Sequence, residues 1–244
     1  MTIFERYQTA GVTPPPCHLR AKRPRPIPLD DDTGRAFALT DPPRGTVREI
    51  VRALDVEQSL RYRPKGGETQ CNVYFHDVMH ALGVYGPRAW WVDDELERCL
   101  DLAQERNEKD LVPPQRALEM NTWDALWGHT ANEIRANELL GWLRTWGRMY
   151  RWAEFDSVGW LASKATEGMA GVICARNRDP RRSGHVTVVI GAQGFGEAIQ
   201  SQAGRVCRQE FVGSPDDPKR NWWESSSFAD VGFFAAPIPA GGRT

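Results

Sequence analysis

Near Gly168 the residue pattern of this chain changes from a helical to a strand-like period, and this change restricts the fold more than any other feature. Apolar residues recur at helical spacing before it and at strand spacing after it. The predicted helices cover 47–54, 71–82, 92–107, 113–122, 132–146 and 156–167. The predicted strands cover 171–175, 184–190, 197–202 and 230–234. Helices followed by strands predict an α+β domain in which an early helix packs on a C-terminal antiparallel sheet.

The N-terminal segment is rich in Pro, Arg and Asp, and contains Pro14-Pro15-Pro16, Arg23-Pro24-Arg25-Pro26 and Asp30-Asp31-Asp32. Such a segment buries little apolar surface, so we predict an extended arm over residues 1–45. The rest of the chain, 46–244, is long enough for one domain with a sizeable core, and we predict a helical insertion in it at about 92–146.

Composition argues against several classes of protein. The net charge is −1, which gives no bulk attraction to nucleic acid, and no apolar run is long enough to span a bilayer. The start, Met1-Thr2-Ile3-Phe4-Glu5-Arg6, lacks the basic and apolar segments of a secretory signal, which predicts a protein that is cytoplasmic as synthesised. Five cysteines without CxxC spacing predict free thiols in a reducing compartment.

Cys71 is expected at the first turn of a helix, with Thr69 as the predicted cap. A helix N-terminus carries partial positive charge and free N–H groups, which stabilise a thiolate and can hold an oxyanion. Asn72, the next residue, is a candidate for oxyanion support. Helical spacing puts Cys71 on the apolar face with Phe75 and Val78, so the thiol should point toward the sheet. The alternative is that Cys71 is a buried apolar side chain without chemistry.

His185 opens a predicted strand, where its imidazole could take the proton of a thiol and pass it to a leaving amine. The next predicted strand contains Gln200 and Gln202, which share one face because they are two residues apart. One of them would accept the second imidazole N–H and orient the ring, and we favour Gln202 over Gln200. Cys71, His185 and Gln202 therefore predict a cysteine hydrolase of amide bonds that needs no cofactor.

The segment His76-Asp77-Val78-Met79-His80 offers a second chemistry. Two histidines four residues apart, with an acid after the first, are similar to the H-E-x-x-H pattern of zinc peptidases, and His129 is available as a further ligand. Asp is one methylene shorter than Glu, and helical spacing places both histidines roughly opposite Cys71. A zinc hydrolase stays open as an alternative.

Tryptophan is frequent, with ten residues, and most are expected in the core. Some would line a substrate groove if their rings are exposed beside the predicted helical insertion. The candidates for this groove wall are Trp90, Trp91, Trp123 and Trp127.

Three segments of the chain resemble the papain-like bacterial cell-wall amidases and endopeptidases of the CHAP and NlpC type. They are Thr69-Gln70-Cys71-Asn72-Val73-Tyr74-Phe75-His76-Asp77-Val78, Gly184-His185-Val186-Thr187-Val188-Val189 and Ile199-Gln200-Ser201-Gln202-Ala203-Gly204. The resemblance spans about 60–234 and implies a papain-like fold. It implies Cys71 as nucleophile, His185 as base and then acid, and Gln200 or Gln202 as the orienting group. Tyr62 is similar to an aromatic residue that some relatives keep beside the nucleophile.

The same resemblance implies peptidoglycan, or another peptide-containing substrate, as the partner. Phage endolysins and antibacterial effectors belong to this group and can lack a signal peptide, so such a protein would be released or delivered to the cell wall. A non-catalytic binding or structural module of a phage or secretion system is the main alternative, and acyl transfer by the same residues is another. The bond cleaved, the target wall, the role of the arm and the oligomeric state stay open.

Overall fold

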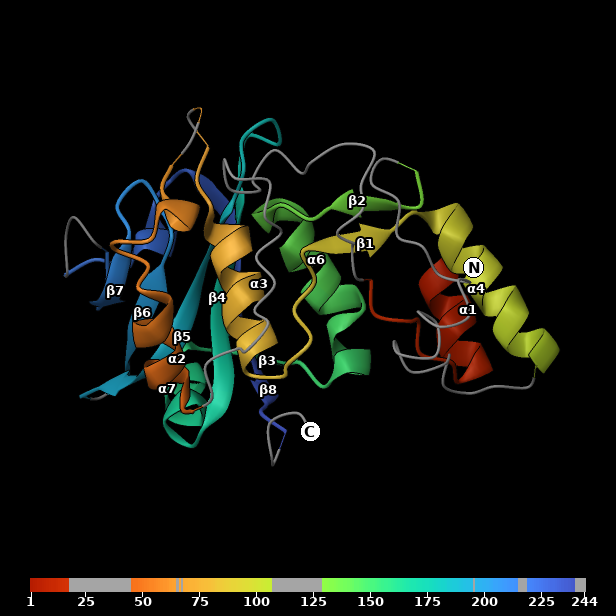
Figure 1. Ribbon diagram of the computed structural model, residues 1–244, viewed down its shortest axis with the longest axis horizontal. Coiled ribbons are helices and arrows are strands. Elements are labelled where there is room, and N and C mark those ends of the chain that lie inside the picture. Colours follow the sequence, from red (N-terminus) through yellow and green to blue (C-terminus); the bar gives the residue numbers. More distant parts are fainter. Residues whose placement is uncertain are drawn as a thin grey trace. The chain divides into compact units, whose positions relative to one another are not determined.

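The computed structural model describes residues 1–17, 45–64, 66, 68–106, 129–194, 196–214 and 219–239. The chain divides into two compact units (Figure 1). Unit 1 consists of Met1–Pro28 and Pro87–Ile134, and unit 2 consists of Leu29–Gly86 and Arg135–Thr244. This division differs from the predicted arm and single domain, because the N-terminal segment joins part of the predicted insertion to form a unit of its own.

Unit 1 is built from helix α1 (Ile3–Ala10), strand β1 (Ala89–Trp91), helix α4 (Asp93–Arg106) and strand β2 (Ala131–Glu133), which pairs antiparallel with β1. The expected extended arm is wrong for α1, because Thr2 and Glu5 form a capping box at its start. Tyr7 is fully buried and its hydroxyl donates to the Leu96 carbonyl oxygen at 2.7 Å, which anchors α1. The rest of the arm, from residue 18 to 44, and the helix predicted at 113–122 lie outside the described residues.

Unit 2 contains a six-stranded sheet in the order β3-β8-β4-β5-β6-β7, with every neighbouring pair antiparallel. An α+β fold is therefore confirmed. The strands are β3 (Ala153–Phe155), β4 (Met169–Asn177), β5 (His185–Gln193), β6 (Glu197–Gln202), β7 (Arg208–Phe211) and β8 (Phe228–Pro237). The helices are α2 (Val47–Leu54), α3 (Cys71–Ala81), α6 (Ala136–Thr145) and α7 (Val158–Thr166), with short 3-10 turns η1 (Leu60–Tyr62), η2 (Gly147–Tyr150) and η3 (Trp222–Glu224).

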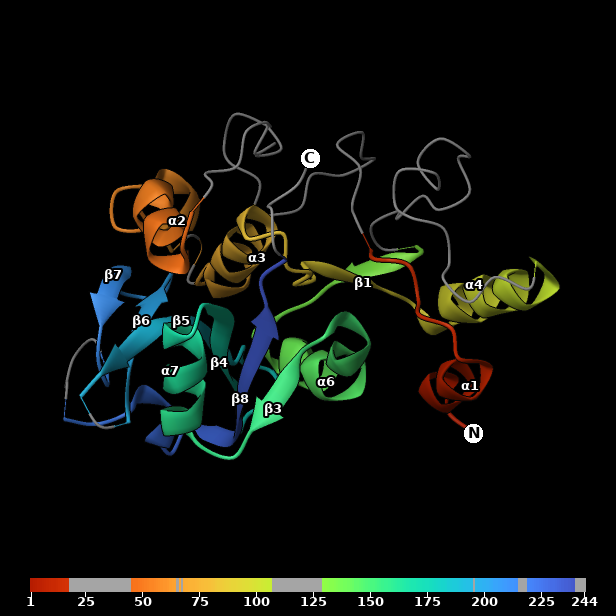
Figure 2. The same cartoon turned by 90° about the horizontal axis from the view of Figure 1, so that it is seen from below.

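Helices cover both faces of this sheet (Figure 2). On one face, Leu161 of α7 packs in a cluster with Ile173 and Ala175 of β4. Cys174 lies between these two strand residues and therefore points to the opposite face, where its Sγ lies 3.4 Å from the Ala136 carbonyl oxygen of α6. Helix α3 contacts β5 and β6, on the side of the sheet away from α7. The nucleophile helix of the sequence prediction thus packs directly on the sheet.

A buried ion pair fixes α3 to the segment that precedes it. Arg61 donates to both carboxylate oxygens of Asp77, at 2.6 and 3.1 Å, and the two side chains are only 7% and 5% exposed. The Tyr62 hydroxyl donates to the same carboxylate at 2.9 Å. A bidentate pair with an additional hydrogen bond at Asp77 holds α3 against the preceding segment.

The hairpin between β4 and β5 needs a glycine just before His185. An added Cβ on Gly184 would overlap the Ala175 carbonyl oxygen and lie 2.7 Å from Asn137 Oδ1. Asn137 itself accepts from the Asn177 N–H at 2.9 Å and donates to the Arg182 carbonyl oxygen at 2.8 Å. One asparagine of α6 therefore fixes both strands of the hairpin.

All five cysteines carry free thiols, as expected. Within the described parts of the chain, no helix is both long and apolar enough to cross a bilayer.

We expect Gly184→Ala to lower the free energy of unfolding by about 2 kcal/mol, because the added methyl group would overlap the Ala175 carbonyl oxygen, a backbone atom of the neighbouring strand. Gly141→Ala in α6 is the matched control, since its Cβ would meet only ordinary contact distances. That control should be neutral or stabilising by up to about 1 kcal/mol. Urea unfolding of both variants makes the measurement, and equal stabilities would contradict the close approach at Gly184.

Asp77→Ala should cost about 3 kcal/mol or more of unfolding free energy, because it leaves the Arg61 cation buried without its carboxylate. Tyr62→Phe removes only one hydrogen bond from the same carboxylate and should cost about 1–2 kcal/mol. Chemical denaturation compares the two variants. If Tyr62→Phe were the more damaging change, the ion pair would not be the main anchor of α3.

Candidate active site

Cys71 is the first residue of α3 and is 2% exposed, with its thiol turned toward the sheet. Its Sγ accepts hydrogen bonds from His185 and from the Val186 backbone N–H, both at the start of β5. Thr69 does not cap the helix; the cap position is Gln70, which makes no side-chain cap hydrogen bond. The Thr69 hydroxyl instead lies 3.9 Å from Sγ and donates to it. The cap prediction was wrong because the sulfur takes that hydroxyl.

His185 lies between Cys71 and Gln202. Its Nε2 is 2.7 Å from Gln202 Oε1, at the end of the neighbouring strand β6. The amide of Gln202 is oriented by its own Nε2, which donates to the Val206 carbonyl oxygen at 2.9 Å. Oε1 must therefore be the acceptor, so Nε2 of the ring carries a proton and Nδ1 is the ring nitrogen left for Cys71. The structure thus brings together the three residues that the sequence nominated as catalytic.

The thiol and the imidazole change each other's proton affinity. Burial would raise the pKa of Cys71, but the hydrogen bond and positive charge of His185 outweigh it and lower that pKa below 9.0. Burial would lower the pKa of His185, but the hydrogen bond and charge of Cys71, with the Gln202 contact, raise it above 6.5. Both directions favour a thiolate beside an imidazolium over a neutral pair.

Gln200 is not an orienting residue of His185, contrary to the second option of the prediction. Its Oε1 accepts from the Thr187 hydroxyl and from Trp222 Nε1, each at 2.8 Å. Trp222 in turn packs edge-on against the His185 ring, with centroids 4.8 Å apart. Gln200 therefore holds the indole that covers one side of the imidazole.

Sequence reasoning missed two residues of the site. Trp222 is one, and the Trp222-Trp223 pair was its only signal. Gln70 is the other: it directly precedes Cys71, is 2% exposed, and its Oε1 has no hydrogen-bond partner among the described residues. Adjacency to the nucleophile was the signal for Gln70. Asn72 is buried in the first turn of α3, and its oxyanion role stays a prediction.

Tyr62 does not serve the nucleophile, because its hydroxyl is committed to Asp77. The same commitment weakens the zinc alternative, since an Asp77 carboxylate held by Arg61 is not available as a base. His76 Nδ1 is bonded to the Gly86 carbonyl oxygen at 2.7 Å, and its ring stacks on His80 with centroids 6.0 Å apart. In the described part of the chain, no three His, Cys, Asp or Glu side chains are placed to hold a metal ion.

The predicted groove wall does not form as expected. Trp91 is 4% exposed inside unit 1, where its Nε1 donates to the Pro15 carbonyl oxygen at 2.8 Å. Trp90 is half-buried on the same strand, and Trp123 and Trp127 lie outside the described residues. A buried indole that donates to backbone packs the core of its own unit and does not face a groove.

No protein-family model and no curated protein sequence matches the chain. The chemistry of the site is therefore inferred from the geometry of Cys71, His185 and Gln202 alone.

We expect iodoacetamide to alkylate Cys71 with a rate that rises through a pKa below 9.0, because a lowered pKa leaves more thiolate at every pH beneath that value. His185→Ala removes the hydrogen bond and the positive charge that lower the pKa of Cys71, while the burial that raises this pKa persists. The alkylation rate of the variant should therefore begin to rise at a higher pH. Alkylation rates of Cys71 across pH, followed by peptide mass spectrometry, make the test. Superimposable profiles for the two proteins would contradict the coupling.

Proposed function

We propose that this protein is a cysteine hydrolase of amide bonds that acts on peptidoglycan. The observation that carries the proposal is the placement of His185 between the Cys71 thiol and the Gln202 amide. A thiolate beside an imidazolium whose other nitrogen is held by a neutral amide is an arrangement suited to acyl transfer. An early helix with the thiol at its tip, packed on an antiparallel sheet, supports assignment to the papain-like class.

In the first half of the reaction, the Cys71 thiolate attacks the carbonyl carbon of the amide. The oxyanion that forms is held by the first-turn N–H groups of α3, which lack partners within the helix. His185 then gives its Nδ1 proton to the leaving nitrogen, the C–N bond breaks, and an acyl-thioester remains on Cys71. Gln202 keeps the ring oriented by accepting from Nε2 throughout.

In the second half, water takes the place of the departed amine. Neutral His185 accepts a proton from that water as its oxygen attacks the thioester carbonyl carbon. Collapse of the intermediate releases the carboxylic acid and restores the thiolate and the imidazolium. No metal or organic cofactor takes part in these steps.

The resemblance to the CHAP and NlpC type supports the cell wall as the target, either the sugar–peptide amide or a bond within the peptides. An endolysin or an antibacterial effector released or delivered to the wall is the biological role that fits this substrate. The bond itself is left to experiment.

We expect purified peptidoglycan to lose turbidity and release new amino groups with the wild-type protein, and Cys71→Ala and His185→Ala to lower the rate by about 10³-fold or more. Cys207→Ala is the matched control, because this half-buried thiol bonds to the Tyr62 and Gly204 carbonyl oxygens and takes no part in the chemistry. It should retain most of the activity. Circular dichroism checks the fold of each variant.

Full activity in Cys71→Ala would overturn the proposal and would return attention to His76 and His80. A chelator should leave the wild-type rate unchanged, and loss of activity on chelation would favour a metal hydrolase.

A further inference from the structure

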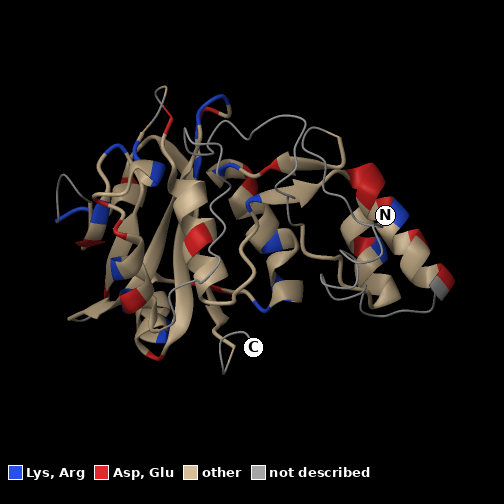
Figure 3. Cartoon of the chain, viewed as in Figure 1, with Lys and Arg blue, Asp and Glu red and all other residues tan. Residues whose placement is uncertain are grey.

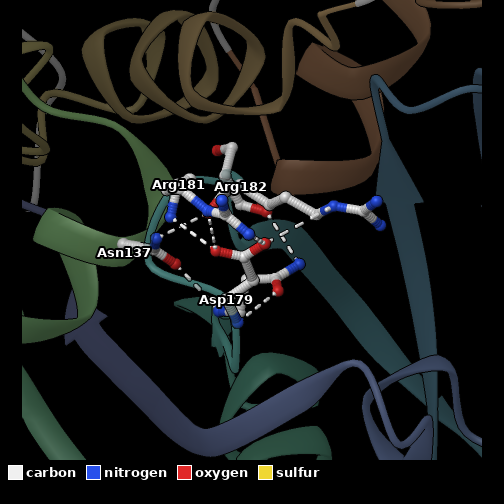
Figure 4. Close-up of polar contacts among 6 residues, drawn as sticks. Asn137, Asp179, Arg181 and Arg182 are labelled. Carbon is white, nitrogen blue, oxygen red and sulfur yellow. Dashed lines mark hydrogen bonds and ion pairs between the residues drawn. The ribbon is translucent and has the colours of Figure 1, made fainter.

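The hairpin between β4 and β5 presents two arginines directly before His185. Arg181 and Arg182 have side chains that are 88% and 76% exposed, although the backbone that carries them is held in place. Figure 4 shows the contacts around Asp179 that hold it. Because this backbone is fixed, binding a ligand orders only the two arginine side chains and not the loop that carries them.

Three residues fix the backbone of this hairpin. Asn137 of α6 donates to the Arg182 carbonyl oxygen at 2.8 Å. Asn177 accepts from the Asp179 N–H at 3.0 Å, and Asp179 accepts from the Arg181 N–H at 3.0 Å. The Arg182 N–H completes the turn by donating to the Asp179 carbonyl oxygen at 3.0 Å. The backbone positions of both arginines are thus set before any substrate binds.

The two guanidinium groups are not equally engaged. Arg181 donates to both carboxylate oxygens of Asp179, each at 3.0 Å. Arg182 approaches the same carboxylate only at 4.0 Å, beyond hydrogen-bond distance. One carboxylate therefore faces two cations, and within the described part of the chain the Arg182 guanidinium makes no hydrogen bond, so it can donate to another anion.

The surrounding loops add to this positive charge. The loops 178–184 and 203–207 and the described residues of 63–70 (63, 64, 66 and 68–70) lie at the end of the sheet where α3 begins, and Figure 3 shows blue on the β4–β5 hairpin. Glu68 is already paired with Arg135 at 3.7 Å. Although the whole chain has a net charge of −1, the described residues of these three loops carry more cations than anions. The described charged residues of these loops are Arg63, Arg178, Arg181, Arg182 and Arg205 against Glu68 and Asp179.

We propose that this hairpin binds a carboxylate of the substrate through Arg182 and Arg181, so that the site selects acidic peptides. The inference rests on the proposed amide hydrolase function and names its substrate class. Arg182 and His185 are three positions apart in the sequence, a backbone reach of at most about 10 Å, which puts the bound carboxylate one or two peptide residues from the scissile amide. A nucleic acid would supply the anion but no amide for Cys71 to attack.

Alkylation of Cys71 by a charged and a neutral reagent tests this without knowledge of the substrate. We expect the ratio of the iodoacetate to the iodoacetamide rate to fall about 3- to 10-fold in the double variant Arg181→Gln/Arg182→Gln, because the local positive potential attracts the anionic reagent. Arg148→Gln in η2, the turn that follows the C-terminal end of α6, is the control for loss of a cation away from the hairpin. Its ratio should equal that of the wild type.

A second experiment uses peptidoglycan whose free carboxyl groups have been converted to amides. The wild-type protein should cleave it about tenfold more slowly than untreated peptidoglycan, whereas the double variant should cleave both at similar rates. Equal alkylation ratios in all proteins, with normal wild-type hydrolysis of both substrates, would overturn the acidic preference and leave the hydrolase intact. A wild-type Cys71 that neither alkylates below about pH 7 nor cleaves any peptidoglycan would overturn the function and the preference together.

Discussion

The hydrogen bond between His185 and Cys71 is the interaction on which the chemistry of this molecule depends. Cys71 is almost fully buried, and burial alone would keep its thiol protonated. The imidazole reverses that tendency because it supplies both a donor and a positive charge at the sulfur. His185, which is itself held by Gln202, thus offsets the free-energy cost of burying a negative charge on Cys71. The proposed thiolate nucleophile depends on all three residues.

The fold maintains this contact from several directions. The Arg61–Asp77 ion pair fixes the position of α3, and Asn137 fixes the hairpin that delivers His185. Antiparallel pairing of β5 with β6 brings the first residue of one strand close to the last residue of the other, which places Gln202 beside His185. Trp222 covers the imidazole and is held by Gln200. The same hairpin carries the arginines, so the proposed recognition and the proposed catalysis share one rigid support.

Periodicity in the sequence predicted the long elements well and the short ones poorly. Helices α4 and α7 and strands β4 to β6 were expected near their observed bounds, because each repeats its pattern over two or more periods. Strands β1, β2, β3 and β7 have only three or four residues, too few for a period to show. Helix α1 was missed because the prediction weighed the proline-rich segment after it and not the capping box at Thr2.

For the site, the sequence nominated Cys71, His185 and Gln202, and the structure brings them together. Alternation along the strand could not tell which glutamine contacts His185, since Gln200 and Gln202 share one face. Gln202 makes the contact because it is the last residue of β6, whereas Gln200 lies two residues further in and contacts Thr187. Trp222 lies on a loop far along the chain, and no local pattern connects it to His185. Contacts of this kind depend on how loops return to the sheet, which residue spacing does not encode.

The most direct test of the central claim is the ultraviolet absorbance of the Cys71 thiolate. The difference spectrum of wild type minus Cys71→Ser, recorded from about pH 6 to pH 9, isolates this one sulfur among five. The lowered pKa of Cys71 predicts a thiolate band that rises with a midpoint below 9.0, and a midpoint at higher pH in His185→Ala. Absence of the band in the folded wild-type protein would mean that the thiol is neutral and that Cys71 is a buried structural residue.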